Sequence, residues 1–189
     1  MTYPADPKDM WKTEVQDLQA ASHLPLTLAC IATTEGPVLE IGVGFHSTPL
    51  LHSLLAGMQR EFVSAESDPY WREVFEPIYA LPRTIPSGCA TTCYDGHHFV
   101  EDTMANLEML ATKHWSVVLV DDSPGYPRCE NVKLFLPVSD YVLVHDAQGE
   151  DIMEPMRPII KDVPHQFMHK RYFPWTLALS LTRAIPHVP

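Results

Sequence analysis

The chain has 189 residues, enough for one globular domain with a sizeable core and too few for two domains of ordinary size. Hydrophobic residues make up 46% of the sequence, which excludes an intrinsically disordered chain. Because 24 Asp and Glu outnumber 13 Lys and Arg, the formal net charge of −11 opposes contact with a phosphate backbone. We therefore expect no nucleic-acid partner and a small-molecule substrate.

The sequence shows no targeting or redox feature. Its start carries early acidic residues and no apolar run, so it predicts no signal peptide, and no stretch reaches the roughly 18 apolar residues of a membrane span. The four cysteines lack the paired short spacing of a structural zinc site and are interpreted as reduced thiols. The alternative is a disulfide or a metal site at Cys89 and Cys93. We expect a cytoplasmic protein without a membrane partner, and the sequence leaves its oligomeric state open.

The amino-terminal part predicts helices. Apolar residues recur at helical spacing over residues 7–21, and a second apolar stretch over 24–33 ends at Gly36 and Pro37. We interpret residues 1–36 as a helical extension and residues 37–189 as a single globular domain.

Strands and helices then alternate. Short apolar runs predict buried strands at residues 38–41, 62–65, 117–120 and 141–144, with a weaker third strand at 90–93. Helical spacing predicts helices over residues 48–58, 69–79, 100–112, 131–136 and 152–160, the last shortened or kinked by two prolines. Residues 166–172 and 175–181 predict a closing antiparallel hairpin. The pattern indicates an α/β fold of Rossmann-like, three-layer type, with a mostly parallel sheet that binds ligands at the carboxyl ends of its strands.

The first candidate site is the glycine loop after the strand at residues 38–41. Gly42 and Gly44 permit close approach of a ligand, and His46 and Ser47 lead into the next helix. A nicotinamide fingerprint would place a third glycine at Ser47, so this loop departs from the NAD pattern. Glu40 is poorly placed beside a pyrophosphate but suits a cofactor with an ammonium group, such as S-adenosylmethionine (SAM). The alternative interpretation is a plain strand-to-helix turn.

A second acidic position follows the next strand. Glu66 lies about 20 residues beyond the glycines, where a carboxylate accepts the ribose hydroxyls in dinucleotide folds. Asp68 and Pro69 then open a helix. The alternatives are a solvated loop acid for Glu66 and an ordinary helix cap for Asp68. Together with the glycine loop, Glu66 favours an adenosyl cofactor.

These two segments carry a resemblance. Val38-Leu-Glu-Ile-Gly-Val-Gly resembles the first motif of class I SAM-dependent methyltransferases, and Val63-Ser-Ala-Glu-Ser-Asp-Pro resembles the second. The resemblance implies a seven-stranded sheet whose last two strands form the hairpin. It also implies that SAM is the cofactor, with Glu66 at the ribose and Asp95 near the adenine amino group. The residues expected to bind the cofactor are Glu40, Gly42, Gly44, His46, Ser47, Glu66 and Asp95.

Polar residues also follow the two clearest strands. Asp121 ends the strand at residues 117–120, and His145 and Asp146 end the strand at 141–144. If these strands are adjacent, the three side chains share one rim of the ligand cleft. We expect Asp121, His145 and Asp146 to orient or deprotonate an acceptor. Asp121 and Asp146 are candidate ligands of a divalent cation, and loop capping is the alternative.

A weaker resemblance concerns the acceptor. The pattern Asp-x-Pro-Gly-Tyr, which begins at Asp122, together with a later Val-His-Asp is similar to polysaccharide O-methyltransferases that act on glucuronic acid. We expect no membrane anchor of the kind usual in those enzymes, so their substrate is not carried over. We expect methyl transfer to an oxygen or nitrogen of a small-molecule or saccharide acceptor. The alternatives are a SAM-binding module without activity, an NAD-dependent oxidoreductase, and a SAM reaction that moves another part of the cofactor.

Overall fold

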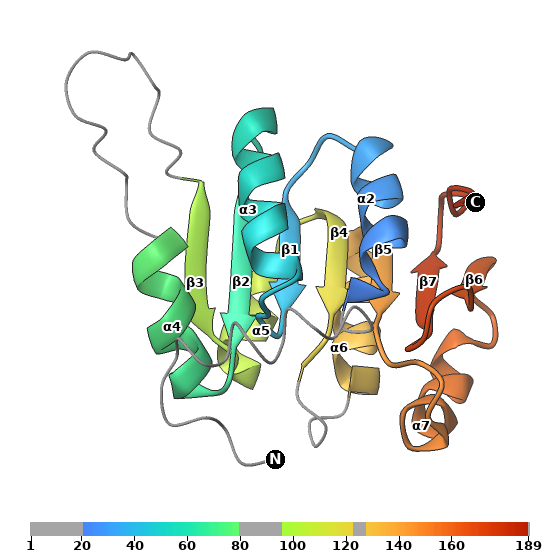
Figure 1. Cartoon of the computed structure of the whole chain (residues 1–189). Helices are drawn as coiled ribbons and strands as arrows, with labels where there is room; N and C mark the ends of the chain where they lie inside the picture. Colours follow the sequence, from blue (N-terminus) through green and yellow to red (C-terminus); the bar gives the residue numbers. More distant parts are fainter. Residues whose placement is uncertain (1–20, 80–95, 123–127, 189) are drawn as a thin grey trace.

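The computed structural model describes residues 21–79, 96–122 and 128–188. Its centre is a seven-stranded sheet in the order β3-β2-β1-β4-β5-β7-β6 (Figure 1). The strands are β1 (Val38–Ile41), β2 (Phe62–Glu66), β3 (His97–Glu101), β4 (Trp115–Val120), β5 (Ser139–Val144), β6 (His165–His169) and β7 (Thr176–Ser180). Strands β1 to β5 pair in parallel, and β7 runs antiparallel to both β5 and β6. The predicted mostly parallel sheet with a carboxyl-terminal hairpin is confirmed.

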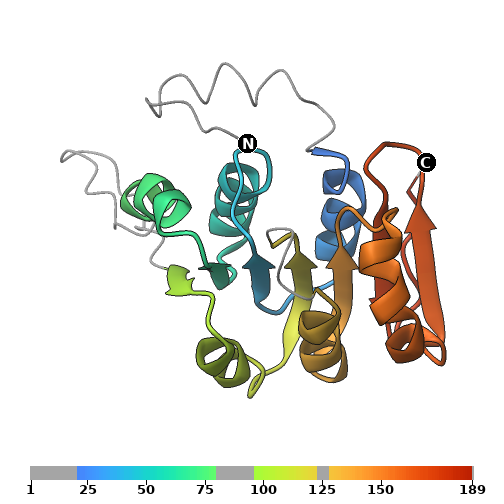
Figure 2. The same ribbon diagram turned by 90° about the horizontal axis from the view of Figure 1, so that it is seen from below.

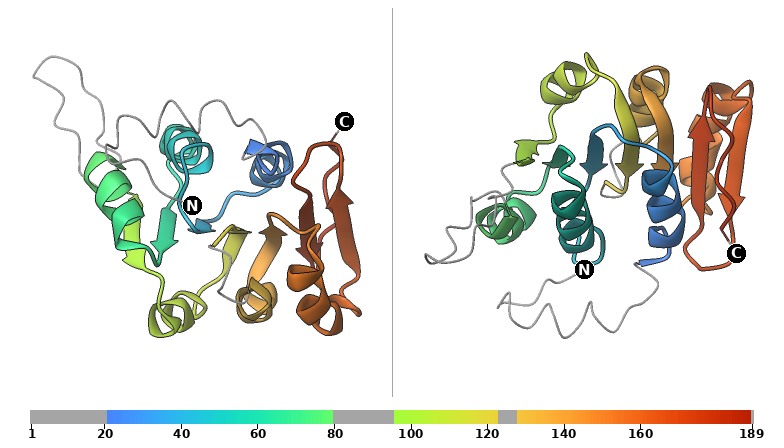
Figure 3. Two further views of the ribbon diagram at one scale, coloured as in Figure 1. Left: turned by 60° about the horizontal axis from the view of Figure 1, so that its bottom comes forward. Right: turned by 90° about the horizontal axis from the view of Figure 1, so that it is seen from above.

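Helices cover both faces of this sheet. On one face lie α2 (Leu24–Ala32), α3 (Ser47–Met58) and α4 (Pro69–Tyr79). On the other lie α5 (Met104–Leu110), α6 (Arg128–Phe135) with the 3₁₀ turn η2 (Leu136–Val138), and α7 (Glu150–Ile160). Figures 2 and 3 show these two layers with the sheet between them, which confirms the predicted three-layer arrangement. No helix in the described ranges is long and apolar enough to span a membrane.

Strand β4 shows why its sequence forms a central strand. All six residues of Trp-Ser-Val-Val-Leu-Val are buried, as expected for a parallel strand covered on both faces. Val118 and Val120 pack in the cluster that includes α5, α6 and α7, whereas Val117 and Leu119 pack in the cluster that includes α2 and α3. The alternation of side chains along one strand thus joins both helical layers through a common core.

The third strand differs from the prediction. Residues 90–93 fall outside the described part of the chain, and the strand beside β2 is His97–Glu101, so Val100 belongs to a strand and not to the predicted helix over 100–112. The apolar-run criterion missed this strand because it begins with His97, and histidine is not typical of buried strands. In the fold the His97 ring stacks on the Phe62 ring with their centroids 4.2 Å apart, and His97 Nε2 lies 3.0 Å from Ser64 Oγ.

Two helices also differ in detail. Leu50, one of the apolar residues of α3, is 39% exposed, while Leu51 and Leu55 are fully buried. Helix α7 runs through Pro155 and Pro158 and begins two residues before the predicted range. Each proline removes one backbone donor. The burial of the helix residues Met156 and Ile160 in the core offsets this loss.

Part of the predicted amino-terminal extension belongs to the core. Leu26, Cys30 and Ile31 of α2 are buried in one cluster with Leu51 and Leu55 of α3. The predicted helix over 7–21 lies outside the described residues except for its last position. The division of the chain at residue 36 stays a prediction, but α2 belongs to the same helical layer as α3 and α4.

Candidate functional site

The turn from β1 to α3 is held close to the end of β4. Gly42 has a φ of 90°, a region that side chains other than glycine rarely adopt. A Cβ atom at this position would lie 2.6 Å from the carbonyl carbon of Asp121 and 2.8 Å from the backbone nitrogen of Asp122. Gly44 is less constrained, and its N–H donates to Thr48 Oγ1 at 3.0 Å. Gly42 therefore brings the glycine loop and the acidic end of β4 together.

Glu40 lies beneath the loop and is fully buried. Its Oε2 accepts hydrogen bonds from Thr48 Oγ1 at 2.9 Å and from Ser64 Oγ at 2.8 Å. Burial raises the pKa of Glu40 to about 7, and hydrogen bonds from Ser47, Ser64 and Thr48 offset only part of this effect. Glu40 thus ties α3 and β2 to the glycine loop from inside the core.

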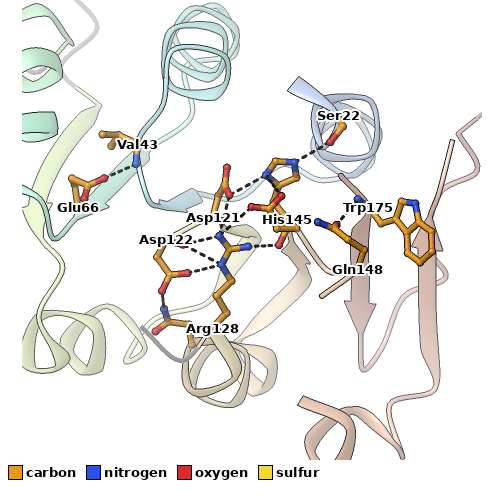
Figure 4. A network of polar contacts seen from close by, with 11 residues as sticks. Ser22, Val43, Glu66, Asp121, Asp122, Arg128, His145, Gln148 and Trp175 are labelled. Atoms are coloured by element: carbon orange, nitrogen blue, oxygen red, sulfur yellow. Dashed lines mark hydrogen bonds and ion pairs between the residues drawn. The ribbon is translucent and has the colours of Figure 1, made fainter. Parts of the chain in front are cut away.

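Glu66 connects the same loop to the end of β2. Its Oε2 accepts the Val43 N–H at 2.9 Å (Figure 4). Its Oε1 accepts the Asp68 N–H at 2.7 Å. The side chain is almost completely buried. Ser67 Oγ donates a longer third bond to Oε1 at 3.5 Å. An ionised carboxylate offers about four acceptor sites, so these bonds leave room for a further donor. The carboxylate of Glu66 thus contacts the glycine loop, and its role at the ribose stays a prediction.

Asp121 and His145 meet where β4 and β5 end side by side. His145 Nδ1 lies 2.9 Å from Asp121 Oδ1, and His145 Nε2 lies 2.9 Å from Ser22 Oγ (Figure 4). Ser22 donates its only proton to the Pro174 carbonyl at 2.7 Å, so its oxygen accepts from His145 Nε2–H. The chain of hydrogen bonds fixes the orientation of the imidazole.

Ionisation follows from these contacts. Burial alone would lower the pKa of His145, but the hydrogen bond and charge of Asp121, with the charge of Asp146, outweigh it and raise the pKa. Burial acts in the opposite sense on Asp121, and the hydrogen bond from His145 together with nearby positive charge lowers its pKa below the usual value. Both shifts in pKa favour the charged forms, an imidazolium at His145 and a carboxylate at Asp121.

A buried arginine organises the remaining acids. Arg128, at the start of α6, donates to the Asp122 carbonyl from Nε at 3.1 Å and from Nη2 at 2.7 Å, and Nη1 donates to the His145 carbonyl. Its Nη2 also lies 3.5 Å from Asp121 Oδ1 and 3.5 Å from Asp146 Oδ2. The guanidinium thus already provides positive charge to the two carboxylates that the sequence suggested as ligands of one divalent cation. That metal assignment stays a prediction.

A cavity of about 160 Å³ opens between the glycine loop and Asp121. The residues that line it come from the glycine loop, the start of α2, α4 and the end of β4, and they are His23, Val43, Gly44, Phe45, His46, Ser47, Trp71 and Asp121. Phe45 and Trp71 pack edge to face, with ring centroids 5.4 Å apart. Of the three residues predicted to be catalytic, Asp121 lines this cavity. His145 does not line it but forms a hydrogen bond with Asp121.

Comparison with protein-family models and with curated protein sequences finds no match. Solved structures do match. The chain superposes on the METTL16 methyltransferase domain with a TM-score of 0.53 at 16% identity, covering 86% of this chain and 66% of that one. It superposes on human methyltransferase-like protein 13 in complex with S-adenosylhomocysteine (SAH) with a TM-score of 0.51 at 13% identity, covering 92% and 83%.

A third match is the SAH-bound methyltransferase PaMTH1 of Podospora anserina, with a TM-score of 0.50 at 11% identity and coverage of 95% and 98%. The chain has the fold of class I SAM-dependent methyltransferases. This methyltransferase fold confirms the architecture that the two sequence motifs implied.

The same matches correct the expected partner. The human METTL16 catalytic domain has been solved in complex with the MAT2A 3′UTR hairpin 1. METTL16, whose methyltransferase domain superposes on this chain with the TM-score of 0.53, is thus a protein with this fold and a nucleic-acid partner. The prediction of a small-molecule partner and no nucleic acid was wrong because net charge averages over the whole surface, whereas phosphate contacts depend on the local charge of the binding face.

The residue predicted at the adenine, Asp95, does not follow the third strand of the sheet. Asp95 lies outside the described residues, and it precedes β3 in the sequence instead of following it. The residue after the carboxyl end of β3 is Asp102, which is buried and whose pKa burial and the charge of Glu66 raise to about 6. The assignment of Asp95 to the adenine contact stays a prediction, although Asp95 does not follow the carboxyl end of β3.

Three site residues were missed in the sequence. Ser22 and His23 precede α2, more than 100 residues from their partner His145, so no local spacing relates them. Arg128 stands in an unremarkable stretch of sequence, and only the packing of α6 against the ends of β4 and β5 brings it to the acids. The only hint in the sequence is that Arg128 follows Asp121 and Asp122 by a few residues, whereas the burial of its charge is known only from the fold.

Proposed function

We propose that the chain binds SAM at the glycine loop and transfers its methyl group to an oxygen or nitrogen atom of an acceptor. The observation that carries this proposal is the joint position of the glycine loop, Glu66 and Asp121 at the carboxyl edge of a methyltransferase fold. In open α/β sheets this edge, beside the point where the strand order reverses, is where ligands bind.

The cavity fits one end of the cofactor. Its volume of about 160 Å³ is well below the roughly 300–1,000 Å³ typical of small-molecule pockets, so it would hold only part of SAM. Gly44, His46 and Ser47 line it and would contact the methionyl end. Glu66 does not line it and would accept the ribose hydroxyls beside it. Glu40 would act from below, through the loop that it anchors.

Asp121 is the residue best placed to act on the acceptor, because it lines the cavity and touches His145. A carboxylate with a lowered pKa is a weak base, whereas an efficient general base has a pKa near the working pH. We therefore assign Asp121 to orienting the acceptor by accepting its hydrogen bond. His145 and Asp146 would hold Asp121 and Arg128 in place.

The tip of the β6–β7 hairpin is a candidate surface for the acceptor. Lys170, Arg171, Tyr172 and Phe173 are exposed there. Ser22 bonds to the Pro174 carbonyl, and this contact joins the tip to the His145 network. Basic and aromatic side chains together suit a single-stranded nucleic acid, through phosphate contacts and base stacking. Because the METTL16 catalytic domain forms a complex with a hairpin, nucleic acid belongs among the acceptors to be tested.

Transfer of a labelled methyl group from SAM to single-stranded RNA, single-stranded DNA and protein at low salt tests this proposal. If nucleic acid is the acceptor, Lys170→Glu and Arg171→Glu should each reduce transfer at least tenfold, because a cation at the phosphate path becomes an anion. Lys161→Glu is the matched control. Lys161 is exposed just after α7 and precedes the end of β6 that lies away from the hairpin tip. Equal losses in all three variants would refute the hairpin tip as the acceptor surface.

A further inference from the structure

A cluster of three side chains with the chemistry of metal ligands lies at the edge of the cavity. Within the described residues, one ligand atom from each of His23, Asp121 and His145 lies within 4.8 Å of the other two. The three come from separate elements, namely the residue before α2 and the ends of β4 and β5. We propose that these three residues bind a divalent transition-metal ion of the zinc class.

The geometry of His145 fits a metal ligand. His145 Nδ1 and Asp121 Oδ1 are 2.9 Å apart. Two ligand atoms of a tetrahedral zinc ion, each at about 2.0–2.1 Å from the metal, are separated by about 3.3 Å. Opening the pair by a few tenths of an ångström would therefore let a cation replace the proton that they share.

The opposite nitrogen of the same ring has the partner that metal-bound histidines usually have. A histidine that binds a metal donates its other N–H to a fixed acceptor, which sets the tautomer and the direction of the ring. His145 Nε2–H meets Ser22 Oγ at 2.9 Å, and Ser22 is held in turn by the Pro174 carbonyl. Nδ1 is thereby the nitrogen presented to Asp121 and to the proposed ion.

The donor set selects the class of ion. Two imidazoles and one carboxylate suit Zn²⁺, Co²⁺, Ni²⁺ or Fe²⁺, whereas Mg²⁺ prefers a shell of oxygen atoms. Asp146 Oδ1, 4.0 Å from His145 Nδ1, adds a second negative charge next to the position. Arg128 Nη2 stands 3.5 Å from Asp121 Oδ1, so the ion would share this carboxylate with a neighbouring cation.

A three-ligand site of this kind keeps one position open. His23 and Asp121 line the cavity together with His46 and Ser47, so the open position faces the glycine loop. Zinc sites with three protein ligands leave the fourth position to water or substrate. In this protein it would hold an acceptor oxygen beside the cofactor. This role rests on the proposed methyl transfer, whereas binding of the ion does not.

Calorimetric titration of untagged, metal-stripped protein with Zn²⁺ tests the site, with Mg²⁺ as the comparison ion. We expect one Zn²⁺ per chain and no comparable binding of Mg²⁺. His23→Gln and Asp121→Asn should each weaken Zn²⁺ binding at least tenfold. His114→Gln is the matched control, because His114 is exposed just before β4 at the opposite edge of the sheet. Two variants are used, each checked by thermal melting, so that one folded variant suffices.

Absence of Zn²⁺ binding by the folded wild type would overturn the proposal. So would binding that His114→Gln weakens as much as His23→Gln, since that would indicate adsorption to surface histidines. A parallel titration with SAH separates this proposal from the methyltransferase function. SAH binding without Zn²⁺ binding would refute the metal site and support the cofactor site. Zn²⁺ binding without SAH binding would support the metal site and refute the cofactor site.

Discussion

Replacing Gly42 with alanine is expected to destabilise the fold by about 3 kcal/mol or more. A side chain at positive φ costs about 1–3 kcal/mol, and forcing a methyl group into a packed region adds about 1–3 kcal/mol. At Gly42 both apply, because φ is 90° and the added Cβ would collide with the backbone of Asp121 and Asp122. Urea denaturation followed by circular dichroism measures the change in the free energy of unfolding.

Gly57→Ala is the matched control for this substitution. Gly57 lies in α3, and an added Cβ would meet no atom within 4 Å. Alanine should stabilise the protein there by about 0.5–1 kcal/mol, because the helix propensity of alanine is higher than that of glycine. If Gly42→Ala proved as harmless as Gly57→Ala, the close contact between the glycine loop and the end of β4 would be refuted.

The second large effect is expected at Arg128. Arg128→Met should cost about 3–5 kcal/mol, the usual result of removing one partner from a buried ion pair. The guanidinium is buried, lies near the carboxylates of Asp121, Asp122 and Asp146, and donates to two backbone carbonyls. The loss should shrink as the pH falls, because protonation removes the repulsion between the acids that Arg128 now separates.

Arg157→Met provides the comparison for Arg128. Arg157 pairs with Glu150 on the surface of α7, with side-chain exposures of 58% and 74%. Exposed pairs contribute about 0.2–1 kcal/mol, so this variant should remain within about 1 kcal/mol of the wild type. Urea denaturation of both variants at two pH values decides the matter. A loss below 1 kcal/mol for Arg128→Met would mean that the acids at the end of β4 do not depend on it.

The fold could be predicted from the sequence where periodicity was strong. A run such as Val117 to Val120 is apolar because both faces of a central parallel strand are covered, and this signal needs no other part of the chain. The third strand could not be predicted in this way. Its first residues, His97 and His98, are polar, and His97 is buried against Phe62 and Ser64 of the neighbouring strand and against His52 of α3.

The candidate site could be predicted in the part that strand ends determine. Asp121 and His145 follow strands that pair with each other, so the rule that parallel strands end at one edge brought them together correctly. His23 and Arg128 required knowledge of how α2 and α6 pack against that edge. The net charge of the whole chain was the least informative feature, because the basic residues of the β6–β7 hairpin lie together at one place beside the site.

The most direct test of the central claim is calorimetric titration with SAH of the wild type, Glu66→Gln and Glu61→Gln. Glu61→Gln is the matched control, because Glu61 precedes β2, at the end opposite Glu66, and pairs on the surface with Lys113. We predict saturable binding that Glu66→Gln weakens at least tenfold, about 1.4 kcal/mol, and that Glu61→Gln leaves unchanged. Absence of SAH binding by the folded wild type, or equal binding by all three proteins, would contradict a cofactor site at the glycine loop and Glu66.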